Sequence, residues 1–376
     1  MITREALHKR FTEDGVNFLK SCFEKALKLC SSNTRDNAFK GFKPFSRVCI
    51  WDSSGWHLPD SLKAKLRGNG GSSSDAGCKL QFCYDAKSSS IVHCDVTDGV
   101  TPDQSYSKLH IANEARENDL FIFDLGYYGV EVFSKIAKKG AFFLTRFIHN
   151  TELYVRNGKS LKRIDFVSYL QSKKTMKFLE QQVYIGKKQL KCRLLAIQLP
   201  EKEKNERIRK IKMLAKKRSL KISKERIFLA SWNIFVTNAP TESLPGKLVW
   251  PFYRLRWSIE LIFKQFKSTL NIHCWNHENY HRLMCEIYGK LITATIIMFT
   301  HSRLQQHLWK FKEEEISFEK LFKFFKNNAY LLMEIVLGGN KKTKLFQKLI
   351  RQATRHNKAC LQKSRPTTRQ IIQSLS

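Results

Sequence analysis

Apolar runs of strand length alternate with polar turns in the first part of the chain. RVCIWD at 47–52 is one such run, and it ends in an acid, Asp52. KLQFCYD and SIVHCDVTDG follow and flank the turn-like AKSS, a pattern typical of a β-hairpin. Ahead of these runs, apolar residues recur at helical spacing between 18 and 29. That spacing predicts a short helical N-terminal segment over 1–43.

The next stretch alternates helices with strands. We expect a helix over 103–117, followed by the apolar strand LFIFD, which ends at Asp124. A helix over 128–139, closed by a glycine, and a strand over 141–147 come next. The order strand, hairpin, helix, strand, helix, strand matches the early part of an RNase H-like α/β fold. In such a fold, Asp52 and Asp124 are expected at neighbouring strand ends.

The pattern changes twice in the rest of the chain. Short strand candidates separated by polar turns fill 151–245, so we expect a β-rich insertion there. From Pro251 onward the apolar spacing is mostly helical, which predicts a core helix over 246–272 and a helical C-terminal region over 273–376. With 44–150 as the first part of the core, the predicted fold class is α/β. An RNase H-like catalytic core is interrupted by a β-rich insertion and followed by a mostly helical C-terminal region.

The charge of the chain narrows the class of partner. Lys and Arg number 67 against 33 Asp and Glu, which gives a formal net charge of +34 and a pI of about 9.9. Self-repulsion of this size opposes compaction, so folding alone does not explain it. Nucleic acid offsets it best, because each phosphate contact releases condensed counterions. A ribosomal protein or another enzyme with a basic surface fits the same composition. The basic segment 204–226, with Lys216, Lys217 and Arg218, is predicted to bind phosphates.

The cysteine spacing and the apolar runs of the sequence indicate in which cellular compartment the protein is expected. The ten cysteines include no CxxC pair, which suits a reducing cytosol. The N-terminus lacks the apolar core of a signal peptide, and the longest apolar run, 291–299, is shorter than the roughly 20 residues of a membrane span. We therefore expect a soluble, cytoplasmic protein with no membrane partner.

The most informative segment is YRLRWSIELIFKQFK at 253–267. On one continuous helix, at roughly 100° per residue, Tyr253, Arg256, Glu260 and Lys267 fall within an arc of about 60°. Another side carries apolar residues and predicts a buried face, namely Phe252, Leu255, Ile259, Ile262 and Phe266. An amphipathic helix with an Arg–Glu pair on its solvated face would give the same pattern.

The spacing of these four residues resembles a known signature. Tyr, two residues, Arg, three residues, Glu, six residues and Lys is similar to the YREK signature of the insertion-sequence-four group of DDE transposases. IWDSS around Asp52 and FDLGYY around Asp124 resemble the two acidic motifs of that group, and SWNIFVTN resembles its Trp-bearing strand, here with Trp232. The resemblance covers roughly residues 45–310. Members usually carry a longer DNA-binding region before the first Asp, so 1–43 is expected to be a shortened form of it.

The resemblance implies a metal-dependent DNA transposase. Asp52, Asp124 and Glu260 would be the catalytic residues and would hold two Mg²⁺ ions, for which Mn²⁺ substitutes. The implied reaction is cut-and-paste transposition of an insertion sequence, a mobile element. It proceeds by hydrolytic nicking followed by attack of the freed 3′-hydroxyl on the opposite strand or on target DNA.

The resemblance also implies DNA contacts and partners. Tyr253, Arg256 and Lys267 would contact phosphates near the cut. Trp232 would stack on a flipped base while a DNA hairpin forms. The implied partners are double-stranded DNA, both the terminal inverted repeats of the element and target DNA, and a second copy of the chain in a homodimeric synaptic complex.

Other interpretations of the same residues stay open. An RNase H-like nuclease or resolvase would have no need of Trp232 or of the full signature. A non-catalytic DNA-binding relic of a transposase is a further alternative, although the intact acids argue against it. A separate zinc site is an alternative because four potential ligands are spaced every four residues, His273, His277, His281 and Cys285. The CWN segment after His273 predicts a helix break, which disfavours zinc.

Overall fold

The chain forms two compact units in a computed structural model. The structure describes residues 3–32, 40–71, 73–275, 277–312, 314–330, 333, 342–356 and 366–376. The first unit comprises Met1–Lys43, Arg47–Pro102 and Arg254–Ser376. The second comprises Pro44–Ser46 and Asp103–Tyr253.

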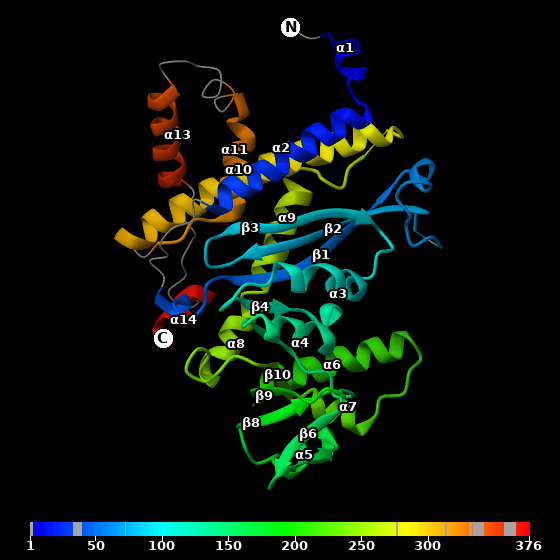
Figure 1. The fold of residues 1–376 in the computed structure, drawn as a ribbon, viewed down its shortest axis with the longest axis vertical. Helices are drawn as coiled ribbons and strands as arrows, with labels where there is room; N and C mark the ends of the chain where they lie inside the picture. The colour runs from blue at the N-terminus through cyan, green and yellow to red at the C-terminus, as the bar shows by residue number, and fades with distance from the viewer. Residues whose placement is uncertain are drawn as a thin grey trace. The chain divides into compact units, whose positions relative to one another are not determined.

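The first unit contains a three-stranded antiparallel sheet, coloured blue to cyan in Figure 1. Its strands are β1 (Val48–Leu58), β2 (Ala76–Asp85) and β3 (Ser90–Asp98). β2 and β3 form the predicted hairpin. Asp85 fixes its turn, because the buried carboxylate accepts hydrogen bonds from the backbone N–H groups of Val48 (2.9 Å), Lys87 (2.9 Å) and Ser88 (3.2 Å). Burial raises the pKa of Asp85, and these bonds offset part of that effect.

Helices cover this sheet. α2 (Glu13–Ser32) and α10 (Tyr280–Lys312) pack side by side and both contact β3 (Figure 1). α9 (Trp257–Ser268) packs on β1, and α11 (Phe318–Asn327) packs on α9 and α10. Phe82 of β2 lies between Phe263 and Phe266 of α9, with 5.6 Å between ring centroids in each pair. The remaining helical elements of this unit are α1 (Arg4–His8), η1 (Lys40–Phe42), η2 (Asp60–Leu62), α13 (Lys342–His356) and α14 (Thr368–Leu375).

α10 is longer than the apolar run 291–299 suggested. By length and composition its segment Tyr280–Lys310 is able to cross a membrane, with a mean hydropathy of 1.4 and 56% of the most apolar window buried in the protein. Leu283, Ile287 and Leu291 are fully buried. A core helix meets the same criterion, so the absence of a membrane partner stays a prediction.

The second unit contains seven strands of the sheet, each paired with its neighbours. β4 (Leu120–Phe123) and β5 (Phe142–Arg146) are parallel, and β10 (Trp232–Thr237) pairs antiparallel with β5. The sheet continues from β10 through β9 (Leu190–Gln198), β8 (Phe178–Ile185), β6 (Leu153–Asn157) and β7 (Ser160–Ile164). The strands predicted over 151–245 therefore extend the sheet that begins with β4 and β5.

Helical elements connect these strands. They are α3 (Asp103–Glu114), η3 (Leu125–Tyr127), α4 (Val130–Lys138), α5 (Phe166–Ser172), α6 (Glu201–Lys217), α7 (Lys224–Leu229) and α8 (Gly246–Arg254). Gly140 follows α4 with a positive φ of 70°, as its predicted role at the end of that helix requires. The basic segment of the chain is mainly α6, whose residues are mostly exposed.

The predicted fold class is confirmed. Three antiparallel strands are followed along the chain by α3, β4, α4 and a β5 parallel to β4, the order expected of an RNase H-like core. The structure is mixed α/β, and every element described after β10 is a helix.

His301 connects α10 to the segment before α11. Its ring is buried and stacks on Phe318 at 3.7 Å between centroids. Nε2 lies 3.1 Å from the carbonyl oxygen of Ile316 and so carries the hydrogen of that bond. Gln305 fixes the same segment, since its Oε1 accepts a hydrogen bond from the N–H of Ile316 at 2.8 Å. Burial and, less strongly, the charge of Arg369 lower the pKa of His301 to about 3.

His301 should make the protein less stable in mild acid. Because the pKa is about 3 in the folded chain and 6.5 in its ordinary state, the unfolded chain takes up the proton first as the pH falls. The stabilisation that neutral His301 gives to the folded chain is present above pH 6.5 and is lost as the pH falls from 6.5 to 3. From pH 7 to pH 5 the loss is about 2 kcal/mol in the free energy of unfolding.

Urea unfolding of the wild type and of His301→Gln at pH 7, 6 and 5 measures this contribution. The wild type should lose about 2 kcal/mol more than the variant over that range, since the other histidines titrate in both proteins. Parallel losses in the two proteins would show that His301 is not the titrating group.

Candidate active site

Asp52 lies within β1, not at its end. The prediction that the strand stops at Asp52 was wrong, because pairing with β2 continues six residues further, from Ser53 opposite Gln81 to Leu58 opposite Ala76. Trp56 and Leu58 are buried at alternate positions, and this burial holds the extension on the core. The Asp52 side chain is 20% exposed. Its Oδ1 accepts a hydrogen bond from the N–H of Ser53 at 2.9 Å.

The signature segment is not one continuous helix. α8 ends at Arg254 and α9 begins at Trp257, so the projection of 253–267 on a single helix was wrong. At the break the backbone makes bonds over three residues, from the N–H of Ser258 to Leu255 and from that of Ile259 to Arg256.

The break separates one residue of the signature from the other three. Tyr253 belongs to the second unit, whereas Arg256, Glu260 and Lys267 belong to the first. The predicted buried face is confirmed nevertheless. Each of its members is at most 5% exposed, namely Phe252, Leu255, Ile259, Ile262 and Phe266.

Arg256 brings two acids together in the first unit. Its Nη2 donates a hydrogen bond to Oε1 of Glu260 at 2.7 Å, and its Nη1 lies 3.4 Å from Oδ2 of Asp52. The three side chains are 17%, 34% and 20% exposed, respectively. Asp52 and Glu260, 208 positions apart in the chain, therefore face one guanidinium. Partial burial strengthens these ion pairs relative to pairs on the open surface.

Lys267 extends the same arrangement along β1. Its Nζ donates a hydrogen bond to the carbonyl oxygen of Gly55 at 3.2 Å. Arg256 and Glu260 thus lie beside Asp52, and Lys267 lies beside the residue three positions further along the strand. These three residues therefore lie along β1, and both cations are bonded to protein oxygen.

Asp124 follows β4 directly, as predicted. It occupies the N-cap position of η3 in an extended conformation, but its side chain makes no capping hydrogen bond. The side chain is half-buried, beside the buried Tyr127 and Tyr128 in the chain. A role as a turn cap therefore does not explain the carboxylate of Asp124.

A further acid near this turn was missed. Oδ2 of Asp103, the first residue of α3, lies 3.7 Å from where a side chain on Gly126 would begin. An acid in the first turn of a helix is common, so no pattern in the sequence indicated that Asp103 would lie near η3.

The donor set suits a hard divalent cation. Carboxylate oxygens are the ligands that Mg²⁺ prefers, and Asp52 and Glu260 already converge on one positive group. Among the residues that the structure describes, no group of three His, Cys, Asp or Glu side chains is arranged to hold a metal. The four residues of the alternative zinc site form no such group either. They do not share one helix, because α10 begins at Tyr280 and His273 and His277 precede it.

Trp232 is buried. It is the first residue of β10, its indole is 3% exposed, and its ring centroid lies 6.5 Å from that of Phe228. Arg207 of α6 donates hydrogen bonds to the carbonyl oxygen of Trp232 (3.0 Å) and to Oδ1 of Asn233 (2.8 Å). Stacking on a base would require the indole to leave this environment, and the role stays a prediction.

Tyr253 is also buried. It is 6% exposed, and its ring lies 5.1 Å from Phe235 and 6.4 Å from Trp250 between centroids. Its contact with a phosphate stays a prediction. Lys216, Lys217 and Arg218, by contrast, are exposed at the C-terminal end of α6, where cations also suit the helix dipole.

Trp257 was not identified from the sequence as an exposed aromatic residue beside the candidate site. It follows Arg256 directly and is 60% exposed. The available signal was its position outside the apolar face of the helix, where a large aromatic side chain is unusual.

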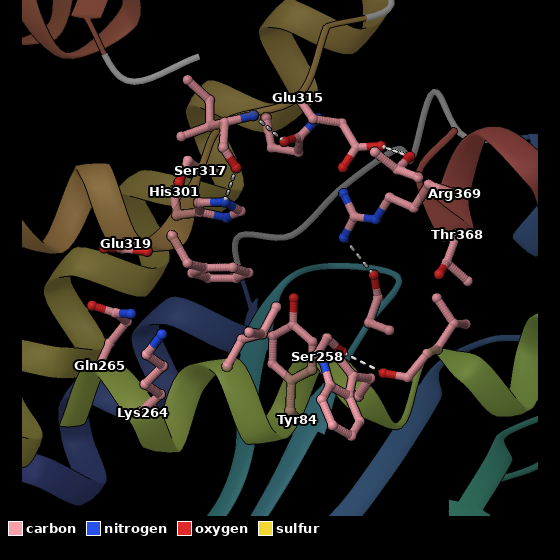
Figure 2. Close-up of a pocket in the computed structure, with 18 of the residues that line it drawn as sticks. Tyr84, Ser258, Lys264, Gln265, His301, Glu315, Ser317, Glu319, Thr368 and Arg369 are labelled. Atoms are coloured by element: carbon pink, nitrogen blue, oxygen red, sulfur yellow. Dashed lines mark hydrogen bonds between the residues drawn. The ribbon is translucent and has the colours of Figure 1, made fainter. Parts of the chain in front are cut away.

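Trp257 borders a cavity of about 380 Å³ on another face of α9. Figure 2 shows Ser258, Lys264 and Gln265 of α9 on one side of this cavity, with His301 and Arg369 across it. The stripe that carries Arg256 and Glu260 does not line the cavity.

Comparison with known proteins identifies the family. Residues 43–296 match the family model described as the transposase DDE domain, a range that includes Asp52, Asp124 and Glu260. The chain belongs to the transposase DDE domain family.

Its relatives include two transposases from Bacillus thuringiensis. The transposase for insertion sequence element IS231F, from subsp. israelensis, is 30% identical over 368 residues, which cover 93% of this chain and 76% of that protein. The transposase for IS231E, from subsp. finitimus, is 31% identical over 351 residues, covering 89% and 73%. A cryo-EM structure of piggyBac transposase in a synaptic complex with hairpin DNA aligns with a TM-score of 0.40 at 12% identity, covering 85% of this chain and 56% of that one.

The two tryptophans should differ in their effect on stability. Trp232→Ala should lower the free energy of unfolding by about 3–5 kcal/mol, because it removes a buried aromatic side chain. Trp257→Ala should change it by about 0.5 kcal/mol, because most of that side chain is already in water. Urea unfolding of both variants measures this difference. A small effect of Trp232→Ala would mean that its indole is exposed in solution.

Proposed function

We propose that the chain cuts and rejoins DNA at the ends of an insertion sequence by cut-and-paste transposition. The observation that carries the proposal is the convergence of Asp52 and Glu260 on Arg256. These residues come from two of the motifs, far apart in sequence, that resemble those of the DDE transposases. The reaction would be hydrolytic nicking followed by strand transfer of the freed 3′-hydroxyl.

Asp52, Asp124 and Glu260 would hold two Mg²⁺ ions. When bound, such ions activate a water or a 3′-hydroxyl and stabilise the leaving oxygen. The half-buried side chain of Asp124, which does not cap η3, supports its part in this set. Arg256 and Lys267 would orient the phosphates beside the scissile bond, the first as a planar fork and the second as a point charge. Tyr253 would donate a hydrogen bond to a nearby phosphate.

Hairpin formation on the second strand would need an aromatic face for an unstacked base. Trp232 is the residue that the resemblance gives for this role, and its burial means that the indole must move to fill it. Trp257 offers a face that is already exposed beside Arg256. Stacking on either indole would contribute roughly 1–3 kcal/mol per base.

The proposed partners follow from the charge and the relatives. The excess of 34 positive charges favours DNA, and the relatives are named for insertion sequence elements. We propose that the chain binds the terminal inverted repeats of its element and the target DNA, as a homodimer in the synaptic complex. Since its substrate would be chromosomal DNA, we also propose that it acts in the cytoplasm of a bacterium.

Metal-dependent nicking should require all three acids. Asp52→Asn, Asp124→Asn and Glu260→Gln keep the size of each side chain but remove its charge, and each should slow nicking by roughly a thousandfold. The assay is strand nicking in Mg²⁺ or Mn²⁺ on DNA that carries the ends of the element. Glu131→Gln and Glu319→Gln are matched controls, because they neutralise exposed acids of α4 and α11.

The products of this assay separate the competing functions. Full activity in Glu260→Gln would refute the assignment of the acids. Nicking without any strand transfer would instead support a nuclease. DNA binding without nicking by the wild type would support a catalytically inactive relic.

DNA binding should depend strongly on salt. Reversing Lys216, Lys217 and Arg218 to Glu should flatten the slope of log affinity against log salt by about 0.9 for each phosphate that these side chains neutralise in the wild type. Fluorescence anisotropy with a labelled duplex at several salt concentrations measures the slope. The control reverses three exposed lysines of the same unit, Lys187, Lys188 and Lys191. Equal flattening in both variants would mean that the total charge matters and the end of α6 does not.

A further inference from the structure

Arg256 contacts both of the acids in the first unit to which the proposed function assigns metal binding. We infer that Arg256 is an internal counter-cation that competes with divalent metal for the Asp52–Glu260 acid pair. The inference rests on the proposed function in one respect, namely that this pair binds metal. It adds that the chain contains its own inhibitor of metal binding, a side chain that must leave the acids before an ion is bound.

The competition follows from which oxygens Arg256 faces. Oδ1 of Asp52 already accepts the N–H of Ser53 at 2.9 Å, whereas Oδ2 faces Nη1 of Arg256 at 3.4 Å. Oε1 of Glu260 accepts Nη2 at 2.7 Å. Mg²⁺ binds carboxylate oxygen at roughly 2.0–2.1 Å, so an ion shared by the two acids would have to occupy the space between them. The guanidinium lies against Oδ2 of Asp52 and Oε1 of Glu260, two of the oxygens that such an ion would need.

Charge adds to this steric argument. Two carboxylates and one guanidinium carry a net charge of −1, whereas the two carboxylates alone carry −2. A divalent cation is therefore attracted less strongly while Arg256 remains in place, and at close range it is repelled by the guanidinium itself. Because Arg256 and Asp52 are only 17% and 20% exposed, water screens this repulsion incompletely.

The pair of Arg256 and Glu260 borders solvent. Arg256 sits at the N-cap position of α9, makes no capping hydrogen bond there, and its partner Glu260 is 34% exposed. An arriving ion can therefore displace the guanidinium toward solvent without unfolding the helix. The freed guanidinium is then available to a DNA phosphate. One side chain would thus link metal binding to DNA binding.

A purely structural role for Arg256 predicts the opposite sign. If the guanidinium only held α9 against β1, removing it would loosen Glu260 relative to Asp52 and weaken metal binding. If it competes with metal, removing it strengthens binding. The sign of the change in metal affinity therefore decides between the two roles.

The experiment measures Mn²⁺ affinity of the full chain without DNA, using electron paramagnetic resonance of the free ion. Arg256→Gln should bind Mn²⁺ about tenfold more tightly than the wild type, because a full positive charge next to the ion is removed. Arg254→Gln is the matched control, since it removes the same charge from an exposed arginine two residues away. It should change the affinity by less than about twofold, because its charge is screened by water. Unchanged or weaker binding by Arg256→Gln would overturn the inference, as would an equal gain in Arg254→Gln.

Two further variants keep the result interpretable. If Arg256→Gln does not fold, as judged by circular dichroism, Arg256→Lys replaces it. Lysine keeps the charge but cannot contact both acids as a planar fork, and binding about threefold tighter than wild type is expected. Binding no tighter than that of the wild type would overturn the inference. Glu260→Gln tests the underlying site. If its Mn²⁺ affinity equals that of the wild type, the proposed function fails at the metal site, an outcome distinct from failure of the competition.

Discussion

The packing of α9 on the sheet of the first unit determines where its acids and cations lie. Phe263 and Phe266 enclose Phe82, and Ile259 and Ile262 are fully buried beside them. Once this face is fixed, each remaining residue of α9 has its direction set, because successive side chains differ by roughly 100°. Glu260 is directed toward the guanidinium that also faces Asp52, and Lys267 toward Gly55. A slip of one residue would turn every one of these groups away from β1. The apolar core therefore sets the geometry of the site.

The cations described here fall into two groups that differ in burial and in hydrogen bonding. Where cations are partly buried, they are bonded to protein oxygen. Arg256 faces two carboxylates, and Arg207 donates to the carbonyl oxygen of Trp232 and the amide oxygen of Asn233. Burial and the nearby charge of Arg146 lower the pKa of Arg207, which means that both disfavour its charged form. The two hydrogen bonds offset part of this unfavourable free energy. Elsewhere, as at the end of α6, basic side chains are exposed and stay solvated. These exposed side chains can bind a polyanion without first losing the kind of partly buried ion pair that holds Arg256.

The sequence predicted features that depend on local spacing. The hairpin of β2 and β3, the helix that begins at Asp103 and the buried face of α9 all follow from the alternation of apolar and polar residues. Features set by distant contacts were missed. The extension of β1 past Asp52 depends on pairing with β2, and β5 pairs with a strand 86 positions further on, counted from Arg146 to Trp232.

The spacing in the sequence predicted which residues of the candidate site lie on one side of α9, but not which aromatic residues are exposed. The signature spacing selected Arg256, Glu260 and Lys267, which the structure places along β1. Spacing carries no information on which aromatic residue faces water. Trp232 is buried and Trp257 is exposed, and the helix break before α9 lies between the positions that the projection had placed on one stripe. At such a break, backbone hydrogen bonds between residues three apart replace those between residues four apart. The spacing of apolar residues does not predict where this replacement occurs.

Arg256 and Lys267 differ in what each must give up before it can bind a phosphate. Lys267 donates to a neutral carbonyl oxygen at 3.2 Å, whereas Arg256 is engaged with two carboxylates. A charge-assisted bond to phosphate is roughly twice as strong as a bond to a neutral acceptor, so Lys267 gains by exchanging its partner. For Arg256 the exchange replaces ion pairs with another ion pair and takes the guanidinium away from two partly buried acids, which is costly. Neutralisation of those acids by a divalent cation removes that cost. In the proposed function, the order in which the two cations become available to DNA would therefore be set by their present partners: Lys267 first, and Arg256 once the acids are compensated.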